Sequence, residues 1–104
     1  MIQLVIASKS EKQLEEIALF LLQSRLVISI DFHKKIRRIE FENDEIKNHN
    51  IHFITGKTKS LLFNEIDFKL REKYSDNIPE IFSHPIVNMD WQLANKLKSD
   101  IEKV

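Results

Sequence analysis

The segment Ile78–Val87 constrains the fold of this chain more than any other stretch. It is rich in β-branched and aromatic residues, so it is predicted to form a strand. Its apolar side chains alternate between two faces, with Ile78, Phe82 and Ile86 on one face and Ile81 and Val87 on the other. A strand that is apolar on both faces needs cover on both sides. We therefore expect helices of the same chain on one face and a partner subunit on the other.

The N-terminal part is predicted to form a strand from Ile2 to Ala7, where apolar residues alternate. Ser10 and Gln13 then match a capping box at the start of a helix. The apolar face of this helix is expected to hold Leu14, Ile17, Ala18, Leu21 and Leu22. Alternation returns over the segment Leu26–Glu42, which predicts a long second strand.

A hairpin is predicted next, because Asn43 and Asp44 tolerate the positive φ angles of a two-residue turn. Folding the chain back about this turn sets Glu42 opposite Glu45, Phe41 opposite Ile46, Glu40 opposite Lys47 and Ile36 opposite Ile51. The third strand is expected to continue as far as Thr58.

Two more helices are predicted around the segment Ile78–Val87. Ser60 is expected to cap the first, whose inner face would hold Leu62, Phe63, Ile66 and Leu70. Asp90 is expected to cap a short last helix, whose inner face would hold Leu93, Ala94, Leu97 and Ile101.

The order of these elements is β-α-β-β-α-β with a short C-terminal helix, which predicts a single domain over residues 1–104. This order is typical of the ferredoxin-like α+β fold, an antiparallel sheet with two helices on one face. The second and third strands are too long for a sheet of this size. Because strands that extend beyond their own sheet expose unpaired backbone, we expect another subunit to pair with them.

Composition excludes several classes of protein. Sixteen basic and sixteen acidic side chains give no net charge, which argues against a nucleic acid or an anionic membrane as the main partner. The absence of cysteine excludes disulfides, thiolate metal sites and cysteine nucleophiles. Gly56 is the only glycine, so no glycine-rich phosphate loop exists. The apolar run Ile2–Ala7 is too short for a signal peptide or a membrane span, so we expect a cytoplasmic protein.

No catalytic residue, metal site or cofactor is predicted. His49 and His52 lie three residues apart, so on a strand they point to opposite faces, and we interpret them as solvated hairpin histidines. Glu80 and His84 share a strand face, but about 13 Å separates them, too far for an acid–base pair. No serine lies in the G-x-S-x-G pattern of a nucleophile elbow.

The basic run from His33 to Arg38 has two interpretations. It is either a nucleic-acid patch or part of an arm that pairs with charges of another subunit. The arm is favoured, because acidic residues follow at once and a strand divides the basic side chains between two faces.

The chain resembles the CutA family of divalent-cation tolerance proteins over nearly its whole length. Ile17-Ala18 through Leu26–Ile30 is similar to the family's helix-to-strand segment, and Lys57-Thr58 matches its K-T at the end of the third strand. Pro79-Glu80-Ile81, with the later His84-Pro85-Ile86 and Trp91, resembles the family's P-E-I, P-I and last aromatic residue. Tyr74-Ser75-Asp76 stands where the family usually has H-P-Y, a stretch associated with metal contact.

This resemblance implies a non-enzymatic homotrimer, related in fold to PII signalling proteins, that binds an ion or a small ligand in clefts between subunits. The implied cleft residues are Lys57, Thr58, Tyr74 and Glu80, with Lys57 as the partner of Glu80. A purely structural ion pair is the alternative for Glu80. For the whole chain, the alternative is a nucleic-acid-binding or enzymatic domain that uses the same fold.

Overall fold

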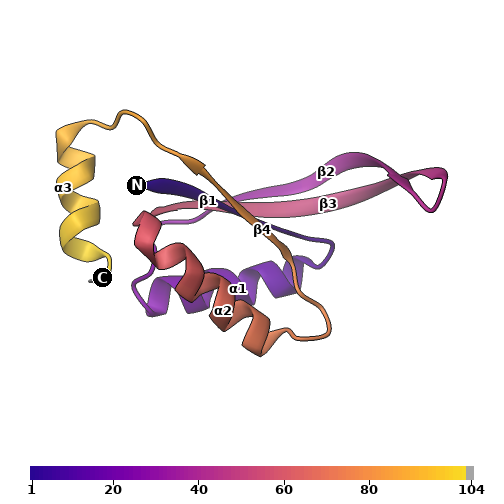
Figure 1. The fold of residues 1–104 in the computed structure, drawn as a ribbon, viewed down its shortest axis with the longest axis horizontal. Helices are drawn as coiled ribbons and strands as arrows, with labels where there is room; N and C mark the ends of the chain where they lie inside the picture. Colours follow the sequence, from indigo (N-terminus) through magenta and orange to yellow (C-terminus); the bar gives the residue numbers. More distant parts are fainter. Residues whose placement is uncertain (103–104) are drawn as a thin grey trace.

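The computed structural model describes residues 1–102 of the chain as one antiparallel sheet with helices on one face and at one end (Figure 1). In order along the chain, its elements are β1 (Ile2–Ser8), α1 (Glu11–Gln23), β2 (Asp31–Glu42), β3 (Glu45–Thr58), η1 (Ser60–Leu62), α2 (Phe63–Lys73), β4 (Glu80–Pro85) and α3 (Trp91–Asp100). The strand order is β2-β3-β1-β4. The ferredoxin-like α+β prediction is confirmed, and residues 103–104 of the predicted domain lie outside the described residues.

The core lies between the sheet and the two helices α1 and α2 (Figure 1). Sheet residues Leu4, Ile6 and Ile54 are almost fully buried there. The predicted inner faces of the helices supply the other side, and their fully buried members are Leu14, Ile17, Leu21, Ile66 and Leu70. Helix α3 lies at the end of the sheet and buries Leu97, and Ile101, directly after the helix, is buried as well. Within residues 1–102, the other face of the sheet carries no helix.

The predicted hairpin is confirmed in every residue pair. Glu42 pairs with Glu45, Phe41 with Ile46, Glu40 with Lys47 and Ile36 with Ile51. Asn43 and Asp44 adopt φ angles of 52° and 61°, as a hairpin turn of this type requires.

Residues 36–51 form an arm that projects from the sheet (Figure 1). Within residues 1–102, β1 pairs only with residues 52–58 of β3, so the rest of β3 pairs with β2 alone. The molecule measures 46 × 29 × 20 Å and its radius of gyration is 14.8 Å. A compact domain of this length would have a radius of about 13 Å. The overlong strands therefore form a two-stranded extension.

The second strand begins later than predicted, at Asp31 rather than at Leu26. Arg25 ends α1 in the left-handed region with φ 56°. The backbone N–H groups of Leu26 and Val27 then donate to the carbonyl of Leu21, at 2.9 and 3.4 Å. These backbone groups serve the end of the helix and are not available to a strand, although both side chains are buried as their apolar character requires.

The loop before β2 passes directly over Gly56, the only glycine of the chain. A Cβ atom at this position would lie 3.0 Å from the carbonyl oxygen of Ser29 and 3.1 Å from Cδ1 of Ile30. The glycine is therefore required by space rather than by an unusual φ angle.

The segment Ile78–Val87 forms a shorter strand than predicted, and β4 covers only its middle. Within this single chain β4 is an edge strand, and it is not buried on both faces. Phe82 is 41% exposed and Val87 is 87% exposed, whereas Ile81 packs against the core. A single chain supplies helices for only one face of the sheet, so the other apolar face is left uncovered.

Two of the predicted helix caps are confirmed and one is wrong. Ser10 accepts a hydrogen bond from the Gln13 backbone N–H, and Asp90 accepts one from that of Leu93. The Gln13 side chain does not return to Ser10 but contacts Ser8 and the carbonyl of Asn77. Ser60 caps nothing, because the turn η1 leads directly into α2 without a side-chain cap.

None of the helices described in residues 1–102 has the length and apolar character needed to cross a membrane.

Candidate functional site

A groove of about 450 Å³ opens where β1 ends, β4 begins and the arm leaves the sheet. Three parts of the chain far apart in sequence form it. Its walls are made by Ala7, Ser8, Lys9, Ser10, Gln13, Arg38, Glu40, His49, Ile51, Asn77, Ile78, Pro79 and Glu80. The groove combines positive, negative and neutral polar side chains, so it suits a small polar ligand or an ion better than an apolar one.

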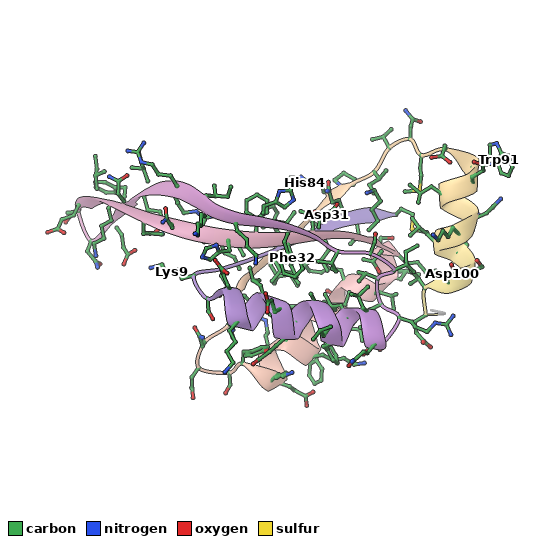
Figure 2. The ribbon with its side chains drawn as sticks, turned by 180° about the vertical axis from the view of Figure 1, so that it is seen from behind. Lys9, Asp31, Phe32, His84, Trp91 and Asp100 are labelled. Carbon is green, nitrogen blue, oxygen red and sulfur yellow. The ribbon has the colours of Figure 1, made fainter. Side chains whose placement is uncertain are left out.

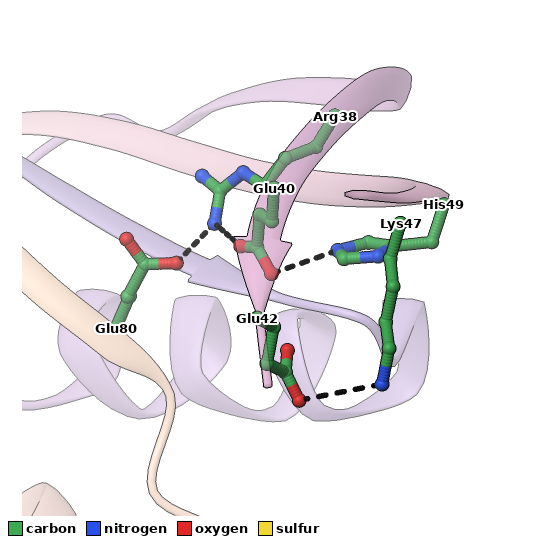
Figure 3. A network of polar contacts seen from close by, with 6 residues as sticks. All are labelled: Arg38, Glu40, Glu42, Lys47, His49 and Glu80. Carbon is green, nitrogen blue, oxygen red and sulfur yellow. Dashed lines mark hydrogen bonds and ion pairs between the residues drawn. The ribbon is translucent and has the colours of Figure 1, made fainter. Parts of the chain in front are cut away.

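Arg38 joins the two carboxylates of this groove (Figure 3). Its Nη1 donates to Oε2 of Glu80 and, at 3.3 Å, to Oε1 of Glu40. The hydrogen bond to Glu80 is the main cause that raises the pKa of Arg38, so the guanidinium stays charged. Arg38 comes from β2 and Glu80 from the start of β4, so this ion pair ties the arm to the far edge strand.

His49 lies beside Glu40 on the same side of the arm (Figure 3). Its Nε2 is 3.8 Å from Oε2 of Glu40, and this nitrogen is buried without a hydrogen-bond partner. An unpaired buried polar atom costs free energy unless a ligand, a water or a proton shift satisfies it. A bound polar group that forms a hydrogen bond with Nε2 of His49 would therefore remove this free-energy cost.

The interpretation of His49 and His52 as solvated histidines is wrong. The two side chains point to opposite faces, as their spacing predicts, but only 20% and 11% of their side-chain surfaces are exposed. His49 lies in the groove, whereas His52 faces the start of α1 and lies 3.7 Å from Glu11. Both lie at the point where the arm joins the sheet, so the sheet and α1 cover them.

Glu80 is the only one of the predicted cleft residues that lines the groove in the described part of the chain. Within the single chain its partner is Arg38 and not the predicted Lys57. Lys57 lies opposite Gln3 on β1 and Glu80 lies opposite Ala7. Four residues of strand separate these two positions by about 13 Å.

Thr58 and Tyr74 are held within the fold. The Thr58 side chain is fully buried, and its hydroxyl donates to the carbonyl of Leu26 at 2.6 Å. The Tyr74 hydroxyl donates to Oε1 of Glu16 at 3.0 Å, and burial together with this bond raises the Tyr74 pKa to about 12. Within the single chain, the four predicted cleft residues do not come together.

The helix-free face of the sheet carries a second hollow, of about 380 Å³. His33 stacks on Phe53 with ring centroids 4.6 Å apart, and His84 meets Phe82 edge to face at 5.4 Å. Val5 and Thr55 line the hollow together with these four rings. The side chain of His84 is labelled in Figure 2. The hollow is thus lined mainly by apolar and aromatic surface with a few polar groups, and it is open in the single chain.

Among residues 1–102, no group of three or more histidine and carboxylate side chains lies close enough to hold a metal ion.

The sequence interpretation missed Arg38, Glu40 and His49 as site residues. One signal was available, because the predicted hairpin register already sets Arg38 opposite His49. Whether Arg38 and His49 also lie near Glu80 depends on which face of the arm is directed toward β4. That direction is decided by an irregularity in β2, whose trace in the sequence is a change from even-numbered apolar positions (Ile30 and Phe32) to odd-numbered ones (Ile39 and Phe41).

The antiparallel sheet, the two helices on one face and the projecting arm define an α+β protein of ferredoxin-like topology. The family model described as CutA1 divalent ion tolerance protein matches residues 2–98. The chain therefore belongs to the CutA1 divalent ion tolerance protein family, which confirms the resemblance found in the sequence.

Solved structures share the fold at low sequence identity. The divalent cation tolerance protein (Cut A1) of Thermus thermophilus is 19% identical with a TM-score of 0.85, covering 98% of this chain and 100% of that chain. The periplasmic divalent cation tolerance protein CutA of Archaeoglobus fulgidus is 21% identical with a TM-score of 0.85 and the same coverage. CutA1 of Oryza sativa is 13% identical with a TM-score of 0.87, covering 99% and 94%. No curated protein matches by sequence.

Proposed function

We propose that this protein is a non-enzymatic homotrimer of the divalent ion tolerance type, which binds an ion or a small polar ligand in clefts between its subunits. The observation that carries the proposal is the uncovered apolar surface of the arm. Ile39, Phe41 and Ile46 are 55%, 74% and 72% exposed in the single chain. Exposed apolar side chains gathered on one projecting element are typical of an interface.

The sheet offers a place for this arm on a second copy. β4 is a free edge strand, and an edge strand presents unpaired backbone N–H and C=O groups. The exposed Phe82 and the hollow beside it lie on the helix-free face next to that edge. An arm from a neighbouring subunit that pairs with this edge covers both surfaces, and three such contacts close a ring.

The proposed ligand site is the groove that contains Arg38, His49 and Glu80. Lys57 and Tyr74 reach such a site only from a second subunit, because within one chain they lie away from it. The ion pair between Arg38 and Glu80 forms part of the wall of this groove. A ligand that binds there competes with this ion pair or completes the hydrogen bonding of His49.

The proposal of no catalysis rests on the family and on the sequence, where no nucleophile lies beside a base. The cytoplasm is the proposed compartment, from the sequence alone, although the Archaeoglobus fulgidus relative is named as periplasmic. A nucleic-acid-binding or enzymatic function is not favoured by any contact in the groove.

Light scattering at micromolar protomer concentration tests the assembly. The wild-type protein is expected to have three times the mass of one chain. Phe41→Ser combined with Ile46→Ser removes apolar surface from the arm, so this double variant is expected to shift toward monomer. Leu61→Ser is the matched control, because Leu61 is 76% exposed but lies in η1, outside the arm. A wild-type protein that stays monomeric overturns the proposal.

Native mass spectrometry with a panel of metal ions and small anions tests the ligand. We expect one member of this panel, other than copper or zinc, to bind in a ratio of one per subunit. This binding is expected to be weakened by Glu80→Gln and retained in Lys98→Gln, a charge change on the last turn of α3. Equal binding by both variants contradicts the proposed site while leaving the trimer intact.

A further inference from the structure

The arm is joined to the sheet through a β-bulge at Lys34 and Lys35. His33 pairs with Phe53 and Ile36 pairs with Ile51, so two residues of β2 lie opposite the single residue His52 of β3. Lys35 adopts a φ angle of 57°. A residue with a Cβ atom is strained in this left-handed region, so local contacts must hold it there.

The bulge decides which side chains of the arm face Glu80. Side chains alternate along a strand, so one extra residue moves every later side chain to the opposite face. Before the bulge, His33 lies on the helix-free face with its partner Phe53. After the bulge, the even-numbered residues Arg38 and Glu40 lie there, and Arg38 meets Glu80. Without the extra residue, Arg37 and Ile39 would occupy that face.

His52 holds the bulge through one hydrogen bond. Its Nδ1 accepts from the backbone N–H of Lys35 at 2.9 Å. An imidazole nitrogen accepts only when it carries no proton, so this contact requires neutral His52 with its hydrogen on Nε2. The side chain is 11% exposed, so water does not readily replace the Lys35 N–H.

Charged groups surround this bond on two sides. From α1, Oε1 of Glu11 lies 3.7 Å from the same Nδ1 atom. From β2, Nζ of Lys34 lies 3.6 Å from Glu11 and 3.8 Å from Glu15, and Lys35 is the bonded residue itself. From β1, the residue opposite His52 is the uncharged Ser8. When Nδ1 of His52 carries a proton, the carboxylate of Glu11 therefore lies close enough to interact with it.

We propose that His52 is a pH-sensitive latch for the arm. When Nδ1 is protonated, it and the Lys35 N–H are both donors, so their hydrogen bond is lost. The new N–H turns to Glu11, which leaves Lys34 with Glu15. The strained bulge then has no side-chain acceptor, and the arm loses the contact that turns Arg38 toward Glu80. This change accompanies the uptake of a proton by His52 as pH falls.

The effect on the ligand groove and on assembly rests on the proposed function, but the latch itself does not. At low pH the arm would detach from Glu80 and from the neighbouring subunit, so acid would weaken the proposed trimer. The latch and its effect on assembly can be tested separately, because the hydrogen bond of the Lys35 amide can be followed whatever the oligomeric state of the protein.

Nuclear magnetic resonance on the ¹⁵N-labelled full chain tests the latch. The imidazole nitrogens of His52 and the amide of Lys35 are followed from pH 8 to pH 5. We expect the exchange protection of the Lys35 amide to fall about tenfold, in step with the His52 titration, since one hydrogen bond is lost. Light scattering of the same samples reports the assembly state separately.

Two variants complete the experiment. His52→Asn places an amide oxygen near the position of Nδ1 that accepts from Lys35 but does not titrate, so Lys35 protection is expected to become independent of pH. His33→Asn is the control, because His33 lies next to the bulge but contacts Thr55 and Phe53, and it should keep the wild-type response. A Lys35 amide that stays protected while His52 titrates overturns the latch, as does an unchanged pH response in His52→Asn.

Discussion

Arg38 is the residue that links the arm to the rest of the molecule, because it contacts Glu40 within the arm and Glu80 on β4. About half of the Glu80 side chain is exposed, which weakens the attraction through solvent screening. Two hydrogen bonds to carboxylates keep the guanidinium in place. The pair therefore contributes more to the direction of the arm than to the stability of the fold.

A double-mutant cycle measures this pair. Arg38→Ala and Glu80→Ala are expected to show a coupling free energy of about 0.5–1 kcal/mol, the range for partly exposed ion pairs. Urea unfolding at one fixed protomer concentration is the measurement. The same cycle with Lys98→Ala is the control and should be additive, because Lys98 lies on the last turn of α3, away from Glu80. Additivity in the Arg38 cycle would show that the two side chains do not interact.

Tyr74 gives a second prediction at this scale, because it is the only tyrosine of the chain. Its folded pKa of about 12 lies above the ordinary value of 10.0, first through burial and then through the bond to Glu16. An acid whose folded pKa is raised contributes stability below its unfolded pKa. That contribution is lost as pH rises between these two values.

Ultraviolet absorbance of the phenolate follows this titration without interference from other tyrosines. We expect a midpoint well above 10 in the wild-type protein and a lower midpoint in Glu16→Gln, where burial remains but the charge and the acceptor carboxylate are gone. Glu15→Gln is the matched control, since Glu15 contacts Lys34 and not Tyr74. A midpoint near 10 in the wild type would contradict this contact.

At the scale of elements, the arm is the feature that distinguishes this sheet from a minimal four-stranded one. Its two strands are 12 and 14 residues long, against 7 and 6 for β1 and β4. The tip is a turn with positive φ at both central residues. A two-stranded ribbon of this kind is marginal in isolation, so the turn and the partner surface both matter to it.

The turn provides a stability prediction. Asp44 has a φ angle of 61°, which glycine adopts without a Cβ penalty and alanine adopts with one. Asp44→Gly is expected to stabilise the hairpin by about 0.5–1 kcal/mol, whereas Asp44→Ala is expected to destabilise it by a similar amount. Amide exchange of the arm residues measures both changes. The same sign in both variants would show that φ at this position is not the controlling factor.

For the whole molecule, the apolar side chains of the arm and the helix-free face of the sheet are both left exposed in the single chain. Phe82 and His84 of β4 line the aromatic hollow, whereas Ile39, Phe41 and Ile46 are exposed on the opposite face of the arm. Burial of this surface by further copies is the proposed reason for an elongated shape in a small domain.

A whole-molecule prediction concerns transition metals. Copper(I) prefers sulfur ligands and copper(II) prefers clustered imidazoles, and the chain has no cysteine and four histidines. His33, His49, His52 and His84 are divided among the helix-free face, the groove and the side of α1. We expect copper and zinc to bind weakly and without fixed stoichiometry in isothermal titration. One tight site per subunit would contradict this, and its loss in His84→Ala would locate it where symmetry-related histidines meet in the trimer.

Local physics was enough to predict much of this molecule. The order of elements follows from hydrophobic periodicity, and the hairpin register follows from Asn43 and Asp44, because both depend on neighbours in sequence. The caps at Ser10 and Asp90 are equally local. The family was recognisable from short motifs in the right order, such as Pro79-Glu80-Ile81.

Tertiary structure decided the rest, because it depends on contacts between distant segments. Leu26–Ile30 alternates like a strand, but the end of α1 and Thr58 take up its backbone groups. Glu80 pairs with Arg38 rather than Lys57 in the single chain. The extra residue of β2 opposite His52 moves the Arg38 side chain to the face on which Glu80 lies. An insertion of one residue reverses every face beyond it, and a change of apolar parity along one strand does not reveal which distant side chains then meet, because that depends on how the strands and β4 pack together.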